Sequence, residues 1–305
     1  MEGMISNQKL IVTGFSGFIG SNLKKYIKGD YQVESLSVRF TPKQKFAFDS
    51  NAIVHLAGKA HDLKEVAVPN EYYDANFELT KQLFDAFLVS KTTVFIFMST
   101  VKAVADEVKG ILKEDQIPNP KTHYGISKNQ AEEYIFSKEL PKGKRVYVLR
   151  PCMIHGPGNK GNLNLLYKLV SKGLPWPLGA FENQRSFLSI ENLCFVIKEL
   201  LENETIPSGV YNVADNNSLS TNELIQILGE SLGKPAKHWR ISQNMICFIA
   251  KVGDILPLPL NSERLQKLTE SYVVSNEKIV KAIGKPLPIS PRDGLKKTFE
   301  SFKKQ

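Results

Sequence analysis

The stretch VTGFSGFIGS, residues 12–21, has a glycine at every third position directly after a short apolar run. Residues 9–13 are predicted to form a buried strand, and residues 20–28 an amphipathic helix. A glycine-rich turn between a strand and a helix is the setting that dinucleotide binding requires. Because a plain strand-to-helix turn can contain the same glycines, the rest of the chain has to decide between the two.

Each glycine of this stretch has a distinct expected task. Gly14 permits a tight turn, Gly17 lets a pyrophosphate approach the backbone, and Gly20 allows close packing of the helix on the strand. The first turn of the helix then presents free N–H groups to the phosphates. With a strand before the glycines and a helix after them, the stretch favours dinucleotide binding.

Composition indicates an ordinary globular protein with a basic balance. The chain has 305 residues, 42% hydrophobic and 23% charged, with a net charge of +9. The basic residues are spread out, and there is neither an RNP-like sequence nor a Cys/His finger, so no nucleic-acid partner is expected. No cluster has metal-ligand spacing, so no metal site is expected either.

Cysteine usage and the apolar stretches indicate a cytoplasmic protein. The three cysteines lie far apart and suggest free thiols in a reducing compartment. The N-terminal residues show no cleavable signal. The apolar stretch MICFIAKVGDILPLPL, residues 245–260, is too short and too interrupted to span a bilayer. No membrane partner is therefore expected.

Strands and helices alternate over the first half of the chain. Strands are predicted at 31–39, 52–58, 92–100 and 145–151, and helices at 70–90 and 122–138. This alternation predicts an α/β fold, a Rossmann-like doubly wound parallel sheet with a smaller mixed C-terminal substrate domain. About a dozen residues separate Arg39 from Ala52, which leaves little room there for a further helix and strand. The adenine-side wall of the fold is therefore expected to be reduced.

The segment THYGISK contains Tyr124 and Lys128, four residues apart and thus on one face of a helix. An ammonium group beside a phenol favours the phenolate, so Lys128 is expected to lower the pKa of Tyr124 and to form a proton shuttle with it. A surface Tyr–Lys pair is the alternative. Thr100 ends a predicted strand, where open α/β sheets bind ligands, and its hydroxyl is placed to hold a substrate oxygen.

Several motifs occur in a characteristic order: TGxxGxxG, HLAG, Asn76 in the following helix, Thr100 at a strand end, YxxxK and LRPxxxxGPG. This order resembles the extended short-chain dehydrogenases/reductases, the nucleotide-sugar epimerase/dehydratase superfamily. The resemblance covers residues from about 9 to about 300 and implies Thr100, Tyr124 and Lys128 as the catalytic group. It also implies NAD(P) binding by Gly14, Gly17, Phe18, Ile19, Gly20, Arg39, Leu56, Ala57, Gly58, Asn76, Tyr124 and Lys128.

The resemblance divides the chain into two parts. Residues 1–158 are expected to form the NAD(P)-binding Rossmann domain, and residues 187–215 to return to it. Residues 159–186 and 216–305 are expected to form the domain that holds the nucleotide-sugar. A homodimer, as is often seen in this superfamily, is a further expectation.

Four residues are expected to contact the substrate. Arg185 and Arg264 occupy positions that resemble diphosphate-binding arginines, and a guanidinium suits phosphate oxygens. Surface arginines are the alternative for both. Asn162 resembles a nucleotide-contacting asparagine, and Lys102 is placed to contact the substrate. An anionic UDP-sugar would account for part of the basic balance.

Departures from the superfamily pattern narrow the reaction. Dehydratases have an acidic pair after the catalytic Thr, whereas Val101 and Lys102 follow Thr100, so dehydration is not expected. Met153 and His155 replace an Asn and a Tyr, which puts a sugar contact in doubt. Four segments, STVKAV, GNLNLL, LPWPLGAFENQRSF and IENL, together most resemble UDP-glucose 4-epimerase-like proteins and 4-keto-sugar reductases of bacterial surface-polysaccharide synthesis. Hydride transfer at C4 of a UDP-hexose or UDP-N-acetylhexosamine is thereby implied, with epimerisation and 4-keto reduction both open.

Cofactor choice and function class also have alternatives. The second predicted strand ends with Ser37 and Arg39 where NAD-preferring sites have an acidic residue, which favours NADP over NAD. Arg39 can instead stack on the adenine. An NAD(P)-sensing regulatory protein on the same fold is the rival function, but such proteins tend to lack the Tyr or the Lys. His55 is expected in the core, and His61 follows the HLAG loop near the expected nicotinamide.

Overall fold

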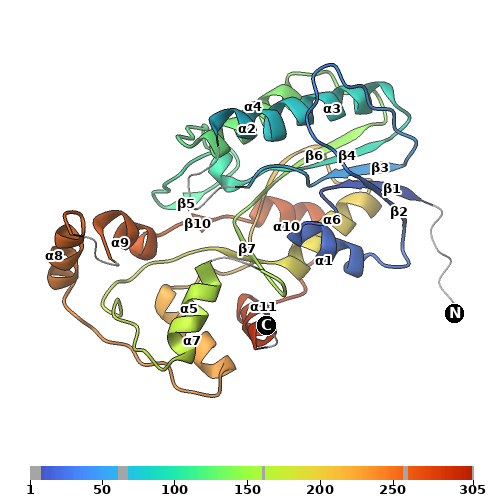
Figure 1. Ribbon diagram of the computed structural model, residues 1–305. Coiled ribbons are helices and arrows are strands. Elements are labelled where there is room, and N and C mark those ends of the chain that lie inside the picture. Colours follow the sequence, from blue (N-terminus) through green and yellow to red (C-terminus); the bar gives the residue numbers. More distant parts are fainter. Residues whose placement is uncertain (1–7, 61–67, 160–161, 257–259, 304–305) are drawn as a thin grey trace, which may run out of the picture.

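The computed structural model describes residues 8–60, 68–159, 162–256 and 260–303, and a six-stranded parallel sheet lies at its centre (Figure 1). The strand order is β2-β1-β3-β4-β6-β9. The strands are β1 (Lys9–Thr13), β2 (Gln32–Leu36), β3 (Ala52–His55), β4 (Val94–Met98), β6 (Arg145–Pro151) and β9 (Gly209–Val213). Every neighbouring pair runs parallel, which confirms the predicted Rossmann-like architecture.

Helices cover both faces of this sheet. The helices α1 (Phe18–Tyr26), α6 (Ile190–Glu202) and α10 (Glu277–Ile283) cover one face. The other face carries α2 (Pro69–Tyr73), the π-helical turn η1 (Asp74–Glu78), α3 (Leu79–Val89) and α4 (His123–Phe136) (Figure 1). Alternate strand residues enter separate cores: Val12 and Ile96 pack on the α1 side, whereas Ile11, Phe95 and Phe97 pack on the α3 side. Side chains of a strand point alternately to its two faces, and both faces are buried here.

The connection after β2 contains no helix or strand over residues 37–51. This confirms that the wall expected on the adenine side is reduced. Because this connection adds no strand beside β2, β2 is the edge of the sheet, next to β1.

A second group of elements packs around its own core. It contains α5 (Asn162–Ser171), α7 (Thr221–Ser231), α8 (Gln243–Gly253), α9 (Ser262–Thr269) and α11 (Pro291–Phe302). Two short strand pairs complete the described chain: β7 (Met153–His155) with β8 (Phe187–Ser189), and β5 (Ile111–Leu112) with β10 (Val273–Val274), while η2 (Val101–Ala103) follows β4. β9 joins the main sheet and α6 packs in the core beneath it, whereas β8, at the start of the range 187–215, pairs with β7 outside that sheet. The domain bounds stay a prediction.

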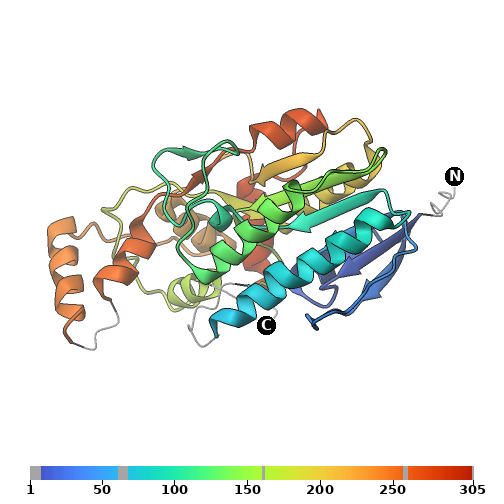
Figure 2. The same cartoon turned by 90° about the horizontal axis from the view of Figure 1, so that it is seen from above.

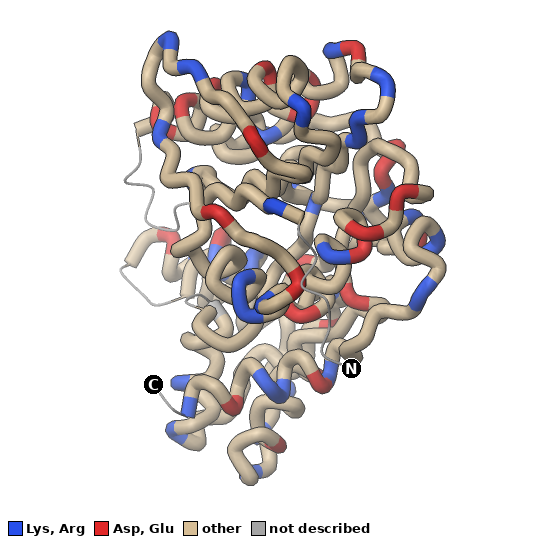
Figure 3. Tube along the Cα trace, turned by 90° about the vertical axis from the view of Figure 1, so that its right-hand side faces the viewer, with Lys and Arg blue, Asp and Glu red and all other residues tan. Residues whose placement is uncertain are grey.

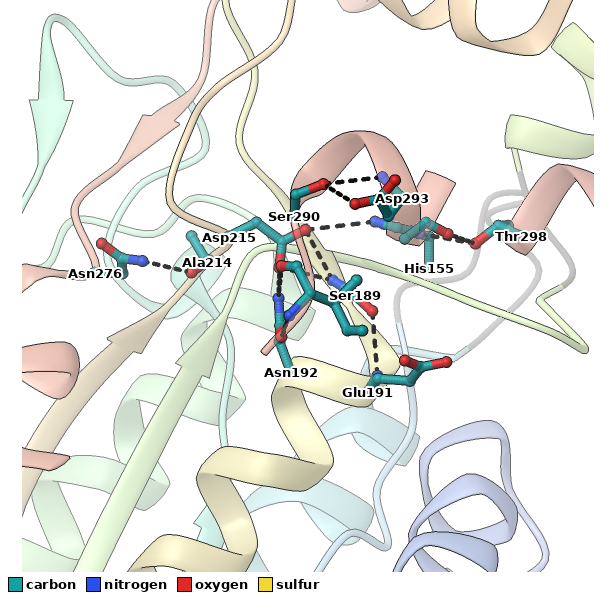
Figure 4. Close-up of polar contacts among 12 residues, drawn as sticks. His155, Ser189, Glu191, Asn192, Ala214, Asp215, Asn276, Ser290, Asp293 and Thr298 are labelled. Atoms are coloured by element: carbon teal, nitrogen blue, oxygen red, sulfur yellow. Dashed lines mark hydrogen bonds and ion pairs between the residues drawn. The ribbon is translucent and has the colours of Figure 1, made fainter. Parts of the chain in front are cut away.

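A buried polar cluster joins β7, α6, α11 and the end of β9 (Figure 4). His155 Nδ1 lies 2.9 Å from Thr298 Oγ1, and its Nε2 lies 3.7 Å from Asp215 Oδ2. The Asp215 carboxylate also accepts hydrogen bonds from the Ser189 backbone N–H at 3.0 Å and from Asn192 Nδ2 at 2.7 Å. His155 therefore helps to hold these elements together as a member of this buried polar cluster.

Among the described residues, none of the helices has the length and apolar character needed to cross a bilayer.

Candidate active site

The glycine-rich turn leaves no room for larger residues. Gly14 has φ +67°, and a Cβ there would lie 2.7 Å from the Ala57 nitrogen. A Cβ on Gly20 would lie 2.6 Å from the Gly14 oxygen and from Phe15 Cα. Gly17 caps α1 through its backbone, and the helix begins at Phe18 without a side-chain cap. The turn is therefore a tight backbone cradle with helix N–H groups at its edge, as a pyrophosphate site requires.

A hollow of about 810 Å³ extends from this turn to the end of β2. Its lining residues are Gly14, Phe15, Ser16, Ser21, Lys24, Lys25, Lys28, Ser35, Leu36, Ser37, Val38 and Ala57. We call it the cofactor cleft. Ser37 lines it as expected, whereas Arg39 is exposed and is not among the lining residues. The three lysines were not anticipated, although LKKYIK stands out in the sequence as a basic cluster.

Thr100 and Tyr124 meet at the carboxyl end of β4. Thr100 is the N-cap of η2, and its side chain hydrogen-bonds the Tyr124 hydroxyl. Burial raises the pKa of Tyr124, and the hydrogen bond from Thr100 opposes this only in part. The expected lowering of this pKa by Lys128 is therefore wrong for the described structure, because desolvation of the phenolate dominates.

Lys128 is buried beside the same strand end. Its Nζ donates a hydrogen bond to the Met98 carbonyl oxygen at 2.8 Å and lies 4.7 Å from the centre of the Phe97 ring. Burial lowers the pKa of Lys128 to about 8, partly opposed by Glu132. The i, i+4 spacing therefore does place Lys128 on the helix face of Tyr124, but the ammonium group is held by the strand.

A buried ion pair lies beneath this group. Glu132, one turn after Lys128, accepts hydrogen bonds from Arg150 Nε at 3.1 and 2.9 Å. Ser99, next to Thr100, donates its hydroxyl proton to the same carboxylate. Both charged side chains are almost fully buried. The pair ties α4 to β4 and β6, and the sequence analysis missed it, although Arg150 lies in the LRP motif.

Asn76 lies fully buried in the π-helical turn η1 and holds the loop after β3. Its Oδ1 accepts from the Lys59 N–H at 2.8 Å, and its Nδ2 donates to Ser127 Oγ at 3.1 Å. A Cβ on Gly58 would lie 2.7 Å from Asn76 Oδ1 and 3.1 Å from Lys128 Nζ. The loop of Leu56, Ala57 and Gly58 therefore runs close to Lys128, and π-helical turns are frequent at functional sites.

His55 is a packed core residue, as predicted. Its Nδ1 lies 2.7 Å from Thr13 Oγ1, and its Nε2 lies 3.0 Å from Thr80 Oγ1. Burial lowers the pKa of His55 to about 3, so the ring stays neutral. Thr13 Oγ1 in turn accepts from the Ala57 N–H at 3.0 Å, which ties the histidine to the cofactor cleft. His61 lies outside the described residues.

A second hollow, of about 550 Å³, contains Thr100 and Tyr124. It is lined by Thr100, Val101, Lys102, Asp106, Glu107, Lys121, Thr122, Tyr124, Cys152, Met153, Arg185, Ser186, Phe187, Glu263, Gln266, Lys267, Glu270 and Tyr272. We call it the substrate cleft. The structure thus brings the expected residues Lys102 and Arg185 into one cleft with Thr100 and Tyr124.

Two cations of the substrate cleft, Arg185 and Lys102, already have partners. Arg185 Nη2 lies 3.2 Å from Glu270 Oε1, and its Nη1 donates to the Lys267 carbonyl at 2.9 Å. Lys102 Nζ donates to the Asp106 carbonyl at 2.7 Å and lies 4.4 Å from the Tyr272 ring centre. Burial lowers the pKa of both cationic groups.

The other residues expected on the substrate side differ in whether they line the substrate cleft. Arg264 is exposed on α9 and is not among the lining residues, whereas Lys267 of the same helix lines the cleft. Asn162 begins α5, and its side chain lies outside the described part of the structure. Met153 lines the cleft, but His155 belongs to the buried polar cluster, so no sugar contact of His155 is supported.

A model of the NAD dependent epimerase/dehydratase family matches residues 10–214, about two thirds of the chain. The chain belongs to this family. Membership makes it an enzyme with a nicotinamide cofactor, and the tight cradle of Gly14 and Gly20 and the cofactor cleft beside it fit such a group.

Individual relatives support the same family. A UDP-glucose 4-epimerase of Vibrio cholerae is 29% identical over 97% of this chain and 95% of its own. An N-acetyl-alpha-D-glucosaminyl-diphospho-ditrans,octacis-undecaprenol 4-epimerase of Escherichia coli O157:H7 is also 29% identical, over 76% and 75%.

Solved structures show the same fold. A UDP-glucuronic acid 4-epimerase from Bacillus cereus in complex with NAD has a TM-score of 0.72 at 20% identity, covering 97% of this chain and 99% of its own. RMD from Pseudomonas aeruginosa complexed with NADPH has the same TM-score and identity, covering 98% and 100%.

Proposed function

We propose that this family member moves a hydride at C4 of a UDP-hexose or UDP-N-acetylhexosamine. The observation that carries the proposal is the hydrogen bond between Thr100 and Tyr124 inside the cleft that also contains Arg185. This arrangement pairs a proton-transfer group with a cation suited to a diphosphate. The curated relatives that act at C4 of sugar diphosphates are consistent with it.

The protein groups divide the work as follows. When bound, the nicotinamide supplies or accepts the hydride. Tyr124 gives the sugar O4 its proton or takes it, while Thr100 hydrogen-bonds the same oxygen. Lys128 holds the nicotinamide ribose, and the glycine-rich turn holds the pyrophosphate with the N-terminus of α1. Arg185 binds the substrate diphosphate, which requires it to exchange its contact with Glu270.

Reduction of a 4-keto sugar is the net reaction that we favour. The Tyr124 hydroxyl lies in the substrate cleft, where it can donate its proton to a ketone oxygen. Lys24, Lys25 and Lys28 line the cofactor cleft together with Ser37, a set suited to the 2′-phosphate of NADPH. Epimerisation uses the same groups and is the alternative, as the relatives' names indicate.

Two assays separate these reactions. The enzyme is incubated with UDP-glucose or UDP-N-acetylglucosamine without added cofactor, and NMR is used to look for the C4 epimer. In parallel, a UDP-4-keto-6-deoxy-N-acetylhexosamine is mixed with NADPH, and its absorbance is followed. We expect NADPH loss in the second assay and no epimer in the first. Epimer formation without NADPH loss would make the enzyme an epimerase, and inactivity in both would refute C4 chemistry on these sugars.

A second substrate class shares the diphosphate. The relative from E. coli acts on a sugar joined through a diphosphate to a polyprenyl chain. Arg185 binds such a diphosphate by the same contacts, and α9, which lines the substrate cleft, packs near exposed apolar residues of α8. Repeating both assays with polyprenyl-diphosphate N-acetylhexosamines in detergent tests this class directly. Turnover of the lipid-linked sugar alone would replace the UDP-sugar assignment.

A further inference from the structure

Helix α8 lies at one end of the molecule (Figures 1 and 2), and several of its apolar side chains are exposed in the described structure. Met245, Phe248 and Ile249 are spaced i, i+3 and i+4, so they share one side of the helix. All three are exposed. Ile246 and Ala250, on a different side, are buried in the second core. The helix thus packs through one apolar stripe and shows a second stripe to solvent.

Further exposed apolar residues lie close to the helix in the sequence. Trp239 precedes the helix, and Ile255 and Leu256 follow it. The relevant side chains are between 39% and 86% exposed, namely Trp239, Met245, Phe248, Ile249, Ile255 and Leu256. We call these six residues the α8 surface. Single exposed apolar residues are normal, but a concentration of them within a short segment indicates an interaction site.

The charge of this segment is positive throughout. Residues 231–253 contain Lys234, Lys237, Arg240 and Lys251, all exposed, and neither Asp nor Glu. The next acidic residue, Asp254, accepts a hydrogen bond from Ser262 Oγ at 2.6 Å. On the far side of the molecule, by contrast, Lys and Arg are interspersed with Asp and Glu (Figure 3). The sequence next to the α8 surface therefore carries four exposed cations and no carboxylate before Asp254.

We propose that the α8 surface binds the face of a lipid bilayer that contains anionic lipids. An apolar stripe with Trp and Phe, flanked by Lys and Arg, is typical of a helix that lies in the membrane interface. Each cation near the headgroups adds attraction to anionic lipid. A second copy of the chain is a poorer occupant, since self-pairing would bring the same cations together.

The proposal departs from the expectation of no membrane partner. That expectation was based on the inability of residues 245–260 to span a bilayer. Lying in the interface requires an exposed apolar stripe and flanking cations rather than spanning length. Because α8 contacts α9, whose Gln266 and Lys267 line the substrate cleft, bound lipid would lie near the cleft wall.

Flotation of the full chain with extruded vesicles tests the proposal. One set contains three parts phosphatidylethanolamine to one part phosphatidylglycerol, and the other contains phosphatidylcholine alone. We expect the protein to float with the anionic vesicles and to be largely released at about 0.5 M NaCl, where charges are screened. Failure to float with either set, or equal binding to both, would overturn the proposal.

Variants locate the binding surface. The double substitution Phe248→Ser and Ile249→Ser should lower the partition coefficient about tenfold, since it removes the apolar contact. Replacing Lys234, Lys237 and Arg240 by Gln should have a similar effect on anionic vesicles only. None of these residues lines the cleft, so turnover of a water-soluble substrate should not change.

Matched controls complete the test. Val89 and Ile117 are 87% and 85% exposed outside the α8 surface, and their substitution by Ser should leave vesicle binding intact. An equal loss in these controls would contradict the assignment. Sedimentation without vesicles tests the other occupant: a dimer that the Phe248→Ser and Ile249→Ser variant dissociates would replace the bilayer by a second copy. Vesicle binding is measured without substrate, so its failure would leave the proposed reaction standing.

Discussion

At the scale of single residues, Tyr124 is the group whose removal should matter most. Tyr124→Phe keeps the ring that fills the cleft and removes only the hydroxyl that bonds Thr100. We expect kcat to fall about 10²- to 10⁴-fold, the usual contribution of a positioned acid or base, with cofactor binding retained. Steady-state kinetics and cofactor titration measure the two effects.

Tyr134→Phe is the control on the same helix. Its hydroxyl donates to Asp85 Oδ1 at 2.6 Å, away from both clefts, so activity should be unchanged. If Tyr124→Phe were as active as Tyr134→Phe, the catalytic role would be refuted and the NAD(P)-sensing alternative would gain support.

The buried, charged Lys128 should lower the free energy of unfolding near neutral pH. Its pKa falls from 10.5 to about 8 on burial, a cost of about 3 kcal/mol while the group is charged. Below pH 8 both folded and unfolded states hold the proton. Between pH 8 and 10.5 the folded state alone loses it, so wild-type stability rises through that window.

Lys128→Met removes this cost of about 3 kcal/mol but also loses the hydrogen bond to Met98, which contributes about 1–2 kcal/mol. The free energy of unfolding at pH 7 should therefore rise by about 1–2 kcal/mol. As the pH rises from 8 to 10.5 the gain should disappear and turn into a loss of about 1–2 kcal/mol, because only the missing hydrogen bond then separates the variant from wild type. Activity should be lost. Urea unfolding at several pH values measures it, with the exposed Lys138→Met as control. A gain that does not change with pH would contradict the buried, charged lysine.

The sequence predicted which residues meet at this scale, but not their electrostatics. The i, i+4 spacing correctly placed Tyr124 and Lys128 on one helix face. The Met98 carbonyl takes the ammonium group, and desolvation raises the tyrosine pKa. Neither effect follows from spacing, because both depend on burial against β4.

At the scale of elements, α4 is tied to the sheet by Glu132 and Arg150. Glu132→Ala leaves the Arg150 guanidinium buried without its partner, which should lower the free energy of unfolding by about 3–5 kcal/mol. Glu133→Ala, its exposed neighbour on the same helix, should change it by less than about 0.5 kcal/mol. Chemical denaturation compares the two. Equal effects would show that the ion pair does not hold α4 in place.

Elements with strong local constraints were predictable. The turn before α1 is fixed by Gly14 and Gly20, whose neighbours leave no space for a Cβ. The missing helix after β2 followed from chain length alone. The π-helical turn at Asn76 was not predictable, because its buried hydrogen bonds involve Lys59 and Ser127, which are distant in the sequence.

At the scale of the whole molecule, the parallel sheet followed from the alternation of strands and helices, and the return of β9 from its apolar pattern. Only part of the substrate cleft was predictable from the sequence. Arg185 was found, but its partner Glu270 comes from 85 residues later and is brought there by the tertiary fold. Most of the α8 surface was recognised in the sequence only as part of an apolar stretch, because hydropathy does not distinguish exposed residues from buried ones.

The central claim is that hydride moves at C4 within the cleft of Thr100 and Tyr124. Deuterium tracing tests it most directly, because the favoured reduction places the hydride of the cofactor on C4 of the sugar. Stoichiometric enzyme, a UDP-4-keto-6-deoxy-N-acetylhexosamine and NADPH carrying deuterium at its transferable position are mixed, and the product is examined by NMR. We predict deuterium at C4 of the sugar with wild-type enzyme and none with Tyr124→Phe in the same time. Deuterium at another carbon would contradict the account, as would an unchanged ketone from an enzyme that also forms no C4 epimer of UDP-glucose or UDP-N-acetylglucosamine.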